Sequence, residues 1–173
     1  MKKNLLSWTI CLSILASAGI AQDPYGIGTA GTGGLVPSLT CPQAWLGNGS
    51  FSLYVNSALG GATAWLGISL QPASLPVGTA QLLISPSPLD LILLLPIPLS
   101  GPPGVGGTGS ALLPIPLTFP STPQLAGTIL YAQALIDEGP GGTLAATRGL
   151  RIELALRPQV FVGTSVGGSA DPT

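Results

Sequence analysis

The chain contains no histidine, and its only lysines are Lys2 and Lys3. Charged residues make up 6% of the 173 positions, so the basic stripe that a nucleic-acid partner needs is missing. Without histidine a serine nucleophile lacks its usual base, and two cysteines are too few for a zinc site. The sequence therefore predicts a protein that is not an enzyme and holds no metal or cofactor.

The amino terminus predicts a helical signal peptide over residues 1–21. Lys2 and Lys3 precede a mostly apolar run at 5–18, and Gly19-Ile-Ala21 offers a small-x-small cleavage site before Gln22. The run is short for a membrane span. We therefore expect a secreted or cell-surface protein without a membrane span after cleavage, and we call residues 22–173 the processed chain.

Removal of the signal leaves Cys41 as the only cysteine, because Cys11 departs with it. An intrachain disulfide is then impossible, and we expect Cys41 to be a buried apolar side chain rather than an intermolecular bridge. Three arginines remain against six acidic residues, which gives the processed chain a net charge of 3 − 6 = −3.

The pattern of turns predicts an all-β fold. The chain has 25 glycines and 18 prolines without a collagen period, yet 46% of its residues are hydrophobic, which suits short strands around a packed core. Turn signals recur about every ten residues, as in a β-sandwich. We expect an antiparallel β-sandwich of jelly-roll or immunoglobulin-like type over 34–157, between a flexible lead-in at 22–33 and a tail at 158–173. Expected strands include 35–40, 51–55, 62–70, 79–84 and 89–95, with a proline-rich turn at 71–78.

The run 128–138 lacks glycine and proline and predicts a central strand that is covered on both faces. It is expected to form a hairpin with 149–156, the cleanest alternating segment of the chain. Gln133 would then be buried and need hydrogen-bond partners. Asp137 and Glu138, which end the run, are adjacent and diverge in a strand, so they indicate a solvated turn rather than a carboxylate pair for catalysis.

A hexapeptide occurs twice. Leu-Leu-Pro-Ile-Pro-Leu spans 94–99 and recurs at 112–117, with a Gly/Pro-rich segment between the copies that predicts a flexible loop. Prolines two residues apart delete two donors on one side of a strand, so both copies predict edge strands that resist edge-to-edge aggregation. The continuous apolar run 91–95 predicts a strand buried on both faces or capped by a loop.

Two catalytic patterns occur in unsuitable places. The G-x-G-x-x-G pattern at 26–31 leads into a proline-broken segment instead of a helix, and G-x-S-x-G at 163–167 has no histidine to serve it. Exposed aromatic residues remain the candidate ligand contacts: Trp45 in a loop, Trp65, and Tyr131 on the same strand face as Gln133. Core packing is the competing interpretation of both tryptophans.

The chain resembles a domain that recurs in secreted proteins of planctomycete-type bacteria. The matching positions begin with Gly34, Pro37 and Leu39 and continue with Phe-x-Leu-x-Val at 51–55. Further matches are Pro120, Pro123, Leu125, Gly127, Leu130, Tyr131, Gln133 and the closing Gly-Leu-x-Ile-x-Leu at 149–154. The resemblance covers residues 33–157 and implies a β-sandwich that often ends larger exported proteins, with no activity or catalytic position to carry over.

Together these features predict an exported, non-catalytic module for surface attachment, assembly or protein interaction. The alternative is a carbohydrate-binding module. The partner would be a protein or a glycan at the cell surface, and not a nucleic acid.

Signal cleavage is directly testable on the exported product. We expect its first residue to be Gln22, which intact-mass measurement and amino-terminal sequencing will show. A product that retains residues 1–21 would contradict the predicted cleavage.

Overall fold

A computed structural model describes residues 22–118, 123–139 and 143–156. The expected signal peptide, the G-x-S-x-G pattern and the tail at 158–173 lie outside these residues. The described part contains one short 3₁₀ helix, η1 (Pro123–Leu125), and no α-helix. Its strands are β1 (Gln22–Tyr25), β2 (Ser38–Thr40), β3 (Ser52–Ala58), β4 (Thr63–Ser69), β5 (Pro72–Val77), β6 (Ala80–Ile84), β7 (Leu91–Pro98), β8 (Gly109–Pro114), β9 (Ile129–Asp137), β10 (Leu144–Ala146) and β11 (Gly149–Glu153).

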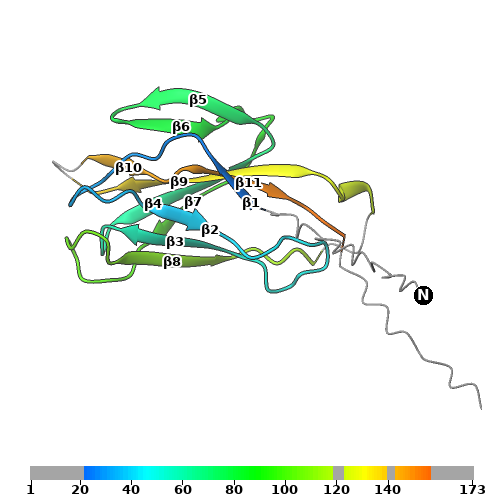
Figure 1. Ribbon diagram of the computed structural model, residues 1–173, viewed down its shortest axis with the longest axis horizontal. Helices are drawn as coiled ribbons and strands as arrows, with labels where there is room; N and C mark the ends of the chain where they lie inside the picture. The colour runs from blue at the N-terminus through cyan, green and yellow to red at the C-terminus, as the bar shows by residue number, and fades with distance from the viewer. Residues whose placement is uncertain (1–21, 119–122, 140–142, 157–173) are drawn as a thin grey trace, which may run out of the picture.

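The strands form antiparallel sheets, which confirms the predicted all-β class (Figure 1). The largest sheet has six strands in the order β1-β11-β9-β4-β7, with β10 also paired to β9. A second sheet has the order β2-β3-β8, and β5 and β6 form a separate hairpin. One hydrophobic cluster joins the first two sheets, with Leu66 and Ile136 from one sheet and Leu53 and Val55 from the other.

Strand β9 is the centre of the larger sheet, as predicted. It pairs with β4 along one side and with β11 and then β10 along the other. Its inner face carries Ala132, Ala134 and Ile136, which are all fully buried. The predicted hairpin with the following alternating segment is also confirmed, since Leu150 lies opposite Ala132.

The outer face of β9 is covered by the β5–β6 hairpin, and Gln133 makes the connection. This side chain is 1% exposed. Its Oε1 accepts the backbone N–H of Leu83 at 2.8 Å, and its Nε2 donates to the carbonyls of Gln81 at 2.9 Å and Thr147 at 3.0 Å. The Tyr25 hydroxyl donates to the Leu83 carbonyl at 2.7 Å. Gln133 and Tyr25 therefore bond the edge of β6 that faces away from β5, as another strand would.

The strand pairing with β9 is interrupted between β10 and β11, and Thr147 makes hydrogen bonds to β9 at this point. Its backbone N–H donates to the Ala134 carbonyl, and its side-chain Oγ1 accepts the Ala134 N–H, both at 3.0 Å. Thr147 is fully buried. The threonine thus completes the pairing of β9 between β10 and β11. In the described residues, every buried polar side-chain atom has a hydrogen-bond partner.

Two segments expected to be irregular are strands. The expected lead-in at 22–33 was predicted to be flexible, but it contains β1, which pairs with β11, and Thr29, which pairs with Ala146. The turn predicted at 71–78 was wrong, because it contains β5. Pro76 lies opposite Gln81. The backbone oxygen of Gln81 accepts a hydrogen bond from Gln133 and therefore points away from β5. At such a position proline removes no donor from the pairing, and β5 is an edge strand that tolerates it.

Both copies of the hexapeptide lie at sheet edges, as predicted. β7 pairs only with β4, and β8 pairs only with β3. The Leu99 N–H donates to the Ala62 carbonyl, and the Leu117 N–H donates to the Asn48 carbonyl. The backbone N–H groups at odd-numbered positions therefore point toward the neighbouring strand in each sheet. Since successive backbone groups alternate sides, the prolines, all at even-numbered positions, occupy the outward side.

Two other expectations about this region were wrong. The run 91–95 is not buried on both faces, because the side chains on the outer face of β7 are left uncovered: Ile92 is 55% and Leu94 is 51% exposed. The loop between the copies is held in place by Gly60, which donates to the Val105 carbonyl at 3.1 Å and accepts from Gly104 at 2.9 Å. A Cβ atom at Gly60 would lie 2.2 Å from the Pro102 oxygen, so glycine is needed for this contact.

Replacing Gln133 with alanine should destabilise the fold by about 2–4 kcal/mol, because two buried backbone groups and one half-buried one lose their partner. Urea unfolding will give this difference. Hydrogen exchange should show the largest loss of protection at the Leu83 amide. Gln43→Ala, at an exposed position, is the matched control and should change the stability little. A Gln133 variant as stable as this control would contradict the assigned role.

Candidate functional site

The three candidate aromatic residues lie in different surroundings. Trp65 is on the outer face of β4 and is 41% exposed, so the competing core assignment is wrong for this residue. Tyr131 is half-buried on β9, and its ring meets that of Tyr25 edge-to-face at 5.6 Å. Trp45 is half-buried in the loop before β3, where its backbone pairs with Ala155.

These aromatic residues do not form a common platform. Trp65 lies opposite Leu135 of β9, and Tyr131 is four residues further along that strand, roughly 13 Å away. The β5–β6 hairpin occupies the space between them, because Ile84 packs on Gly67 so closely that a Cβ there would lie 2.3 Å from its Cδ1. Any ligand of Trp65 therefore cannot also stack on Tyr131.

Burial suppresses ionisation of two nucleophilic groups, the Tyr25 hydroxyl on β1 and the Cys41 thiol beside it. Burial, and then the neighbouring Tyr131, raises the pKa of Tyr25 to about 12. Burial also raises the pKa of the Cys41 thiol to about 11. Cys41 is 5% exposed, which confirms the expected burial, and its N–H donates to Gln22 Oε1 at 3.0 Å. Neither group is poised for nucleophilic attack at neutral pH.

The acidic pair at the end of β9, Asp137 and Glu138, accepts hydrogen bonds from two loops. Glu138 accepts the N–H of Thr32 at 2.9 Å and its hydroxyl at 2.6 Å, so it is not the simple solvated residue that was expected. Asp137 is exposed and accepts the Gly139 N–H. Within the described ranges, no three His, Cys, Asp or Glu residues gather as metal ligands would. The glycine pattern at 26–31 follows β1 and continues into a turn, where no helix terminus is present to bind a phosphate.

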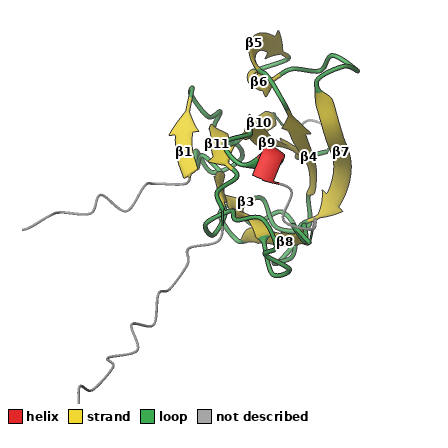
Figure 2. Cartoon of the chain, turned by 90° about the vertical axis from the view of Figure 1, so that its right-hand side faces the viewer, coloured by secondary structure: helices red, strands yellow, loops and turns green. Residues whose placement is uncertain are grey.

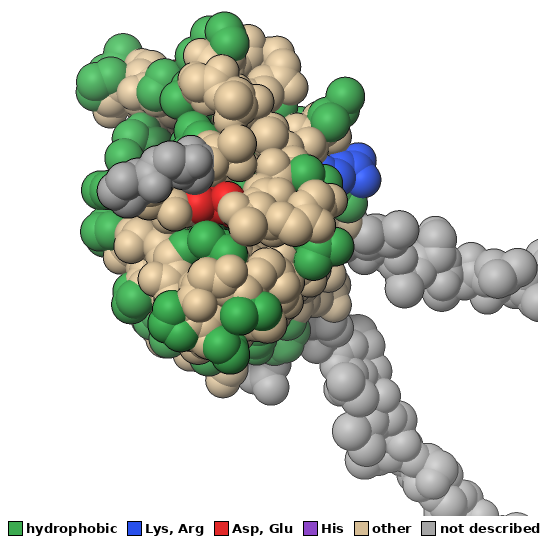
Figure 3. Space-filling model, turned by 90° about the vertical axis from the view of Figure 1, so that its left-hand side faces the viewer, with side chains coloured by type: hydrophobic (Ala, Val, Ile, Leu, Met, Phe, Trp, Pro, Cys, Tyr) green, Lys and Arg blue, Asp and Glu red, His purple; other side chains and the backbone are tan. Residues whose placement is uncertain are grey.

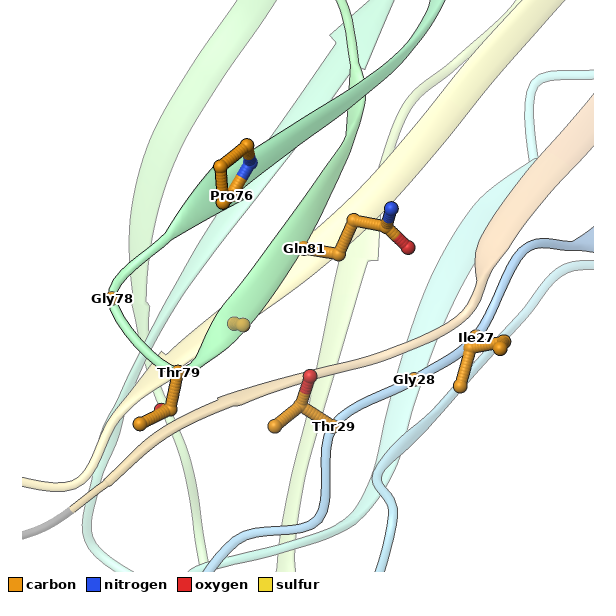
Figure 4. A pocket seen from close by; sticks show the side chains of 8 residues that line it. Ile27, Gly28, Thr29, Pro76, Gly78, Thr79 and Gln81 are labelled. Carbon is orange, nitrogen blue, oxygen red and sulfur yellow. The ribbon is translucent and has the colours of Figure 1, made fainter.

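A shallow groove of about 360 Å³ opens between the tip of the hairpin and the segment after β1 (Figure 4). Thr29, Thr79 and Gln81 supply its polar side chains, and Ile27 and Pro76 supply apolar surface. Thr79 donates its hydroxyl to the Leu144 carbonyl at 3.2 Å, which fixes the tip of the hairpin over β10. No lining residue is charged, so the groove suits a neutral, hydroxyl-bearing ligand better than an ion.

The charged residues are concentrated on one part of the molecule. Of the seven in the described ranges, six lie on β1 or β11 or beside the ends of β9 and β10. The seventh, Asp90, precedes β7 and accepts a hydrogen bond from the Ser85 hydroxyl at 2.8 Å. Figure 3 shows one end of the molecule, where one small acidic area and one small basic area stand among hydrophobic and uncharged side chains.

The outer surface along β7 and β8 carries no charged side chain. We call it the proline edge. It consists of two patches, one on the outer face of each sheet: Trp65, Leu94, Pro96 and Pro98 on the six-stranded sheet, and Tyr54, Leu112, Pro114 and Pro116 on or next to the three-stranded sheet. All eight side chains are exposed. Sequence reasoning missed this surface because it assigned the apolar residues of 91–95 to the interior, although the prolines had already indicated an edge.

The fold and surface define an all-β protein of antiparallel sheets with an uncharged, apolar edge. Comparison with protein-family models, with curated proteins and with solved structures found no match. In the part of the chain that the structure describes, no helix is both long and apolar enough to cross a membrane.

Alkylation of Cys41 tests the description of its surroundings. The thiolate is the reactive form, so iodoacetamide should reach half its maximal rate near pH 11 in the folded processed chain and near pH 9 in urea. The same shift stabilises the folded state below pH 9, and this contribution is lost as the pH rises through 11. A folded-state midpoint near 9 would mean that the thiol is not buried.

Proposed function

We propose that this protein is an exported, non-catalytic β-sandwich module that works by surface contact, in attachment, assembly or protein interaction. The proline edge is the observation that carries the proposal. Contiguous apolar surface on a soluble domain usually marks an interaction site, because leaving it in water is costly. Here the exposed Trp65 lies beside Pro96, and Tyr54 lies beside Leu112, so each sheet presents an apolar patch on its own outer face.

The arrangement of the core supports the sandwich assignment. Leu66 and Ile136 of the larger sheet belong to the same cluster as Leu53 and Val55 of the smaller one. Two sheets that share one core suit a jelly-roll or immunoglobulin-like module and are compatible with the resemblance to the planctomycete domain. Export through a cleaved signal is part of the proposal.

The non-catalytic part of the proposal is supported by the state of the reactive groups. The pKa values of Tyr25 and Cys41 are raised by burial, and the Glu138 carboxylate is bonded to Thr32. General acid–base chemistry near neutral pH needs a titratable group that is accessible and suitably poised, and the Tyr25 hydroxyl and the Cys41 thiol are not such groups.

The alternative function is carbohydrate binding, and the groove beside the hairpin favours it. Its hydroxyl and amide groups at Thr29, Thr79 and Gln81 are suited to sugar hydroxyls, and Ile27 and Pro76 offer apolar contact to the sugar ring. Trp65 is an exposed aromatic residue that is available as a second, separate contact. The groove and the proline edge therefore predict different ligands at different places.

Co-sedimentation of the processed chain with envelopes of the producing cells will separate the two functions. Leu94→Asp with Leu112→Asp places charge on the proline edge, whereas Ile27→Asp places it in the groove. Contact through the proline edge predicts at least about tenfold weaker retention for the double variant, because a buried charge is costly, and no change for Ile27→Asp.

The opposite pattern would reject the proposal in favour of the groove. A glycan array should then show binding that is lost in Ile27→Asp, with Trp65→Ala and Trp45→Ala as tests of the aromatic contacts. Failure of the wild-type chain to bind either envelopes or glycans would argue against both functions.

A further inference from the structure

Asn48 is the centre of the loop that leads from β2 into β3. Its side chain is 7% exposed, although Gly47, Gly49 and Ser50 beside it are exposed. Its Oδ1 accepts the Ser50 N–H at 3.0 Å, and its Nδ2 donates to the Gln43 carbonyl at 3.4 Å. Both ends of this side-chain amide are therefore held inside the loop.

The backbone of Asn48 joins the loop to the segment that follows β8. Its carbonyl accepts the Leu117 N–H at 2.9 Å and the Phe51 N–H at 3.4 Å, and the Leu117 carbonyl accepts the Gly47 N–H at 2.7 Å. β3 and β8 lie side by side (Figure 2), and these bonds extend their contact beyond the paired residues. Phe51 and Leu117 are buried in the shared core, so the loop closes one end of the smaller sheet.

The glycine after Asn48 makes this asparagine chemically labile, and Asn48 is the only asparagine of the chain that glycine follows. In such a pair the backbone nitrogen of the glycine attacks the asparagine Cγ, because glycine has no Cβ to hinder the approach. The N–Cγ bond forms, the Cγ–Nδ2 bond breaks, and ammonia leaves with the proton of the glycine N–H. Water then opens the cyclic imide to aspartate or isoaspartate.

The closed loop opposes this reaction. Two hydrogen bonds hold the Asn48 side chain and two hold its carbonyl, so neither Cγ nor the Gly49 nitrogen is free to approach the other. The reaction therefore requires local opening of the loop. We propose that Asn48-Gly49 is a one-way modification site, at which deamidation takes place when the loop opens and prevents the loop from closing again.

Neither product fits the closed loop. Aspartate at position 48 puts a carboxylate oxygen where Nδ2 now donates to the Gln43 carbonyl, so two acceptors meet at a buried site. In isoaspartate the main chain runs through Cγ, and the carbonyl that accepts from Phe51 and Leu117 becomes part of a carboxylate branch. Either product thus weakens the contact that closes the smaller sheet.

Conversion in the folded and unfolded states tests the site. The processed chain is incubated in mildly alkaline buffer with and without urea, and peptide mass spectrometry with an isoaspartate assay measures conversion of Asn48. We expect conversion to be at least about tenfold slower in the folded chain, because the loop must first open. Asn56, which serine follows, is the internal control and should convert slowly in both states.

Gly49→Ala is the matched variant. A Cβ atom there would lie 3.6 Å from Thr118 Cγ2, an ordinary contact, so the loop should keep its structure. The added methyl group hinders the attack and should slow conversion in urea about tenfold. Equal conversion of the wild type in both states, no conversion of Asn48 in urea, or a Gly49→Ala chain that converts as fast as the wild type would overturn the proposal.

Asn48→Asp tests whether the modified loop closes. Hydrogen exchange at the Phe51 and Leu117 amides should lose protection in this variant, and the same loss should appear in the wild-type chain after conversion. Asn56→Asp, at an exposed position of β3, is the control and should leave both amides protected. Full protection of both amides in Asn48→Asp and in the converted wild type would show that the modification is not one-way.

Discussion

The amide of Gln133 is the contact on which the arrangement of this fold depends. It lies on the central strand β9 and makes three hydrogen bonds to two other segments: to Gln81 and Leu83 of β6, and to Thr147 between β10 and β11. A buried amide without partners is costly, so these bonds specify where the hairpin lies on the sheet. Because the hairpin lies there, it separates Trp65 from Tyr131 and forms one wall of the groove.

The prolines have a complementary role at the other side of the molecule. They end the sheets at β7 and β8, because their outward positions cannot donate to a further strand. Leu94 and Leu112 are exposed on the outer faces of these edge strands. The missing N–H groups limit aggregation through the strand edges, and the uncovered side chains provide the apolar surface on which the proposed function depends.

Sequence reasoning was most successful where local pattern and burial agree. The alternation in 149–156 and the glycine-free run 128–138 gave the correct strand pair, and Gln133 was correctly expected to be buried. It failed where neighbours decide. The segments that form β1 and β5 look irregular because they contain Pro24 and Pro76, yet each is ordered by pairing with a single neighbour, β11 or β6. The candidate aromatics were named correctly as residues, but their separation by the hairpin has no signal in the sequence.

The sequence by itself determined the all-β class and the edge position of both hexapeptide copies. These depend on properties of a residue and its nearest neighbours, such as a missing donor or a period of two. Only the tertiary structure decided which surfaces remain exposed. Whether Leu94 is covered depends on what lies across the sheet from it, and the β5–β6 hairpin covers Gln133 but stops short of Trp65 and β7. Burial is a property of the whole packing arrangement, so a local apolar pattern does not specify it.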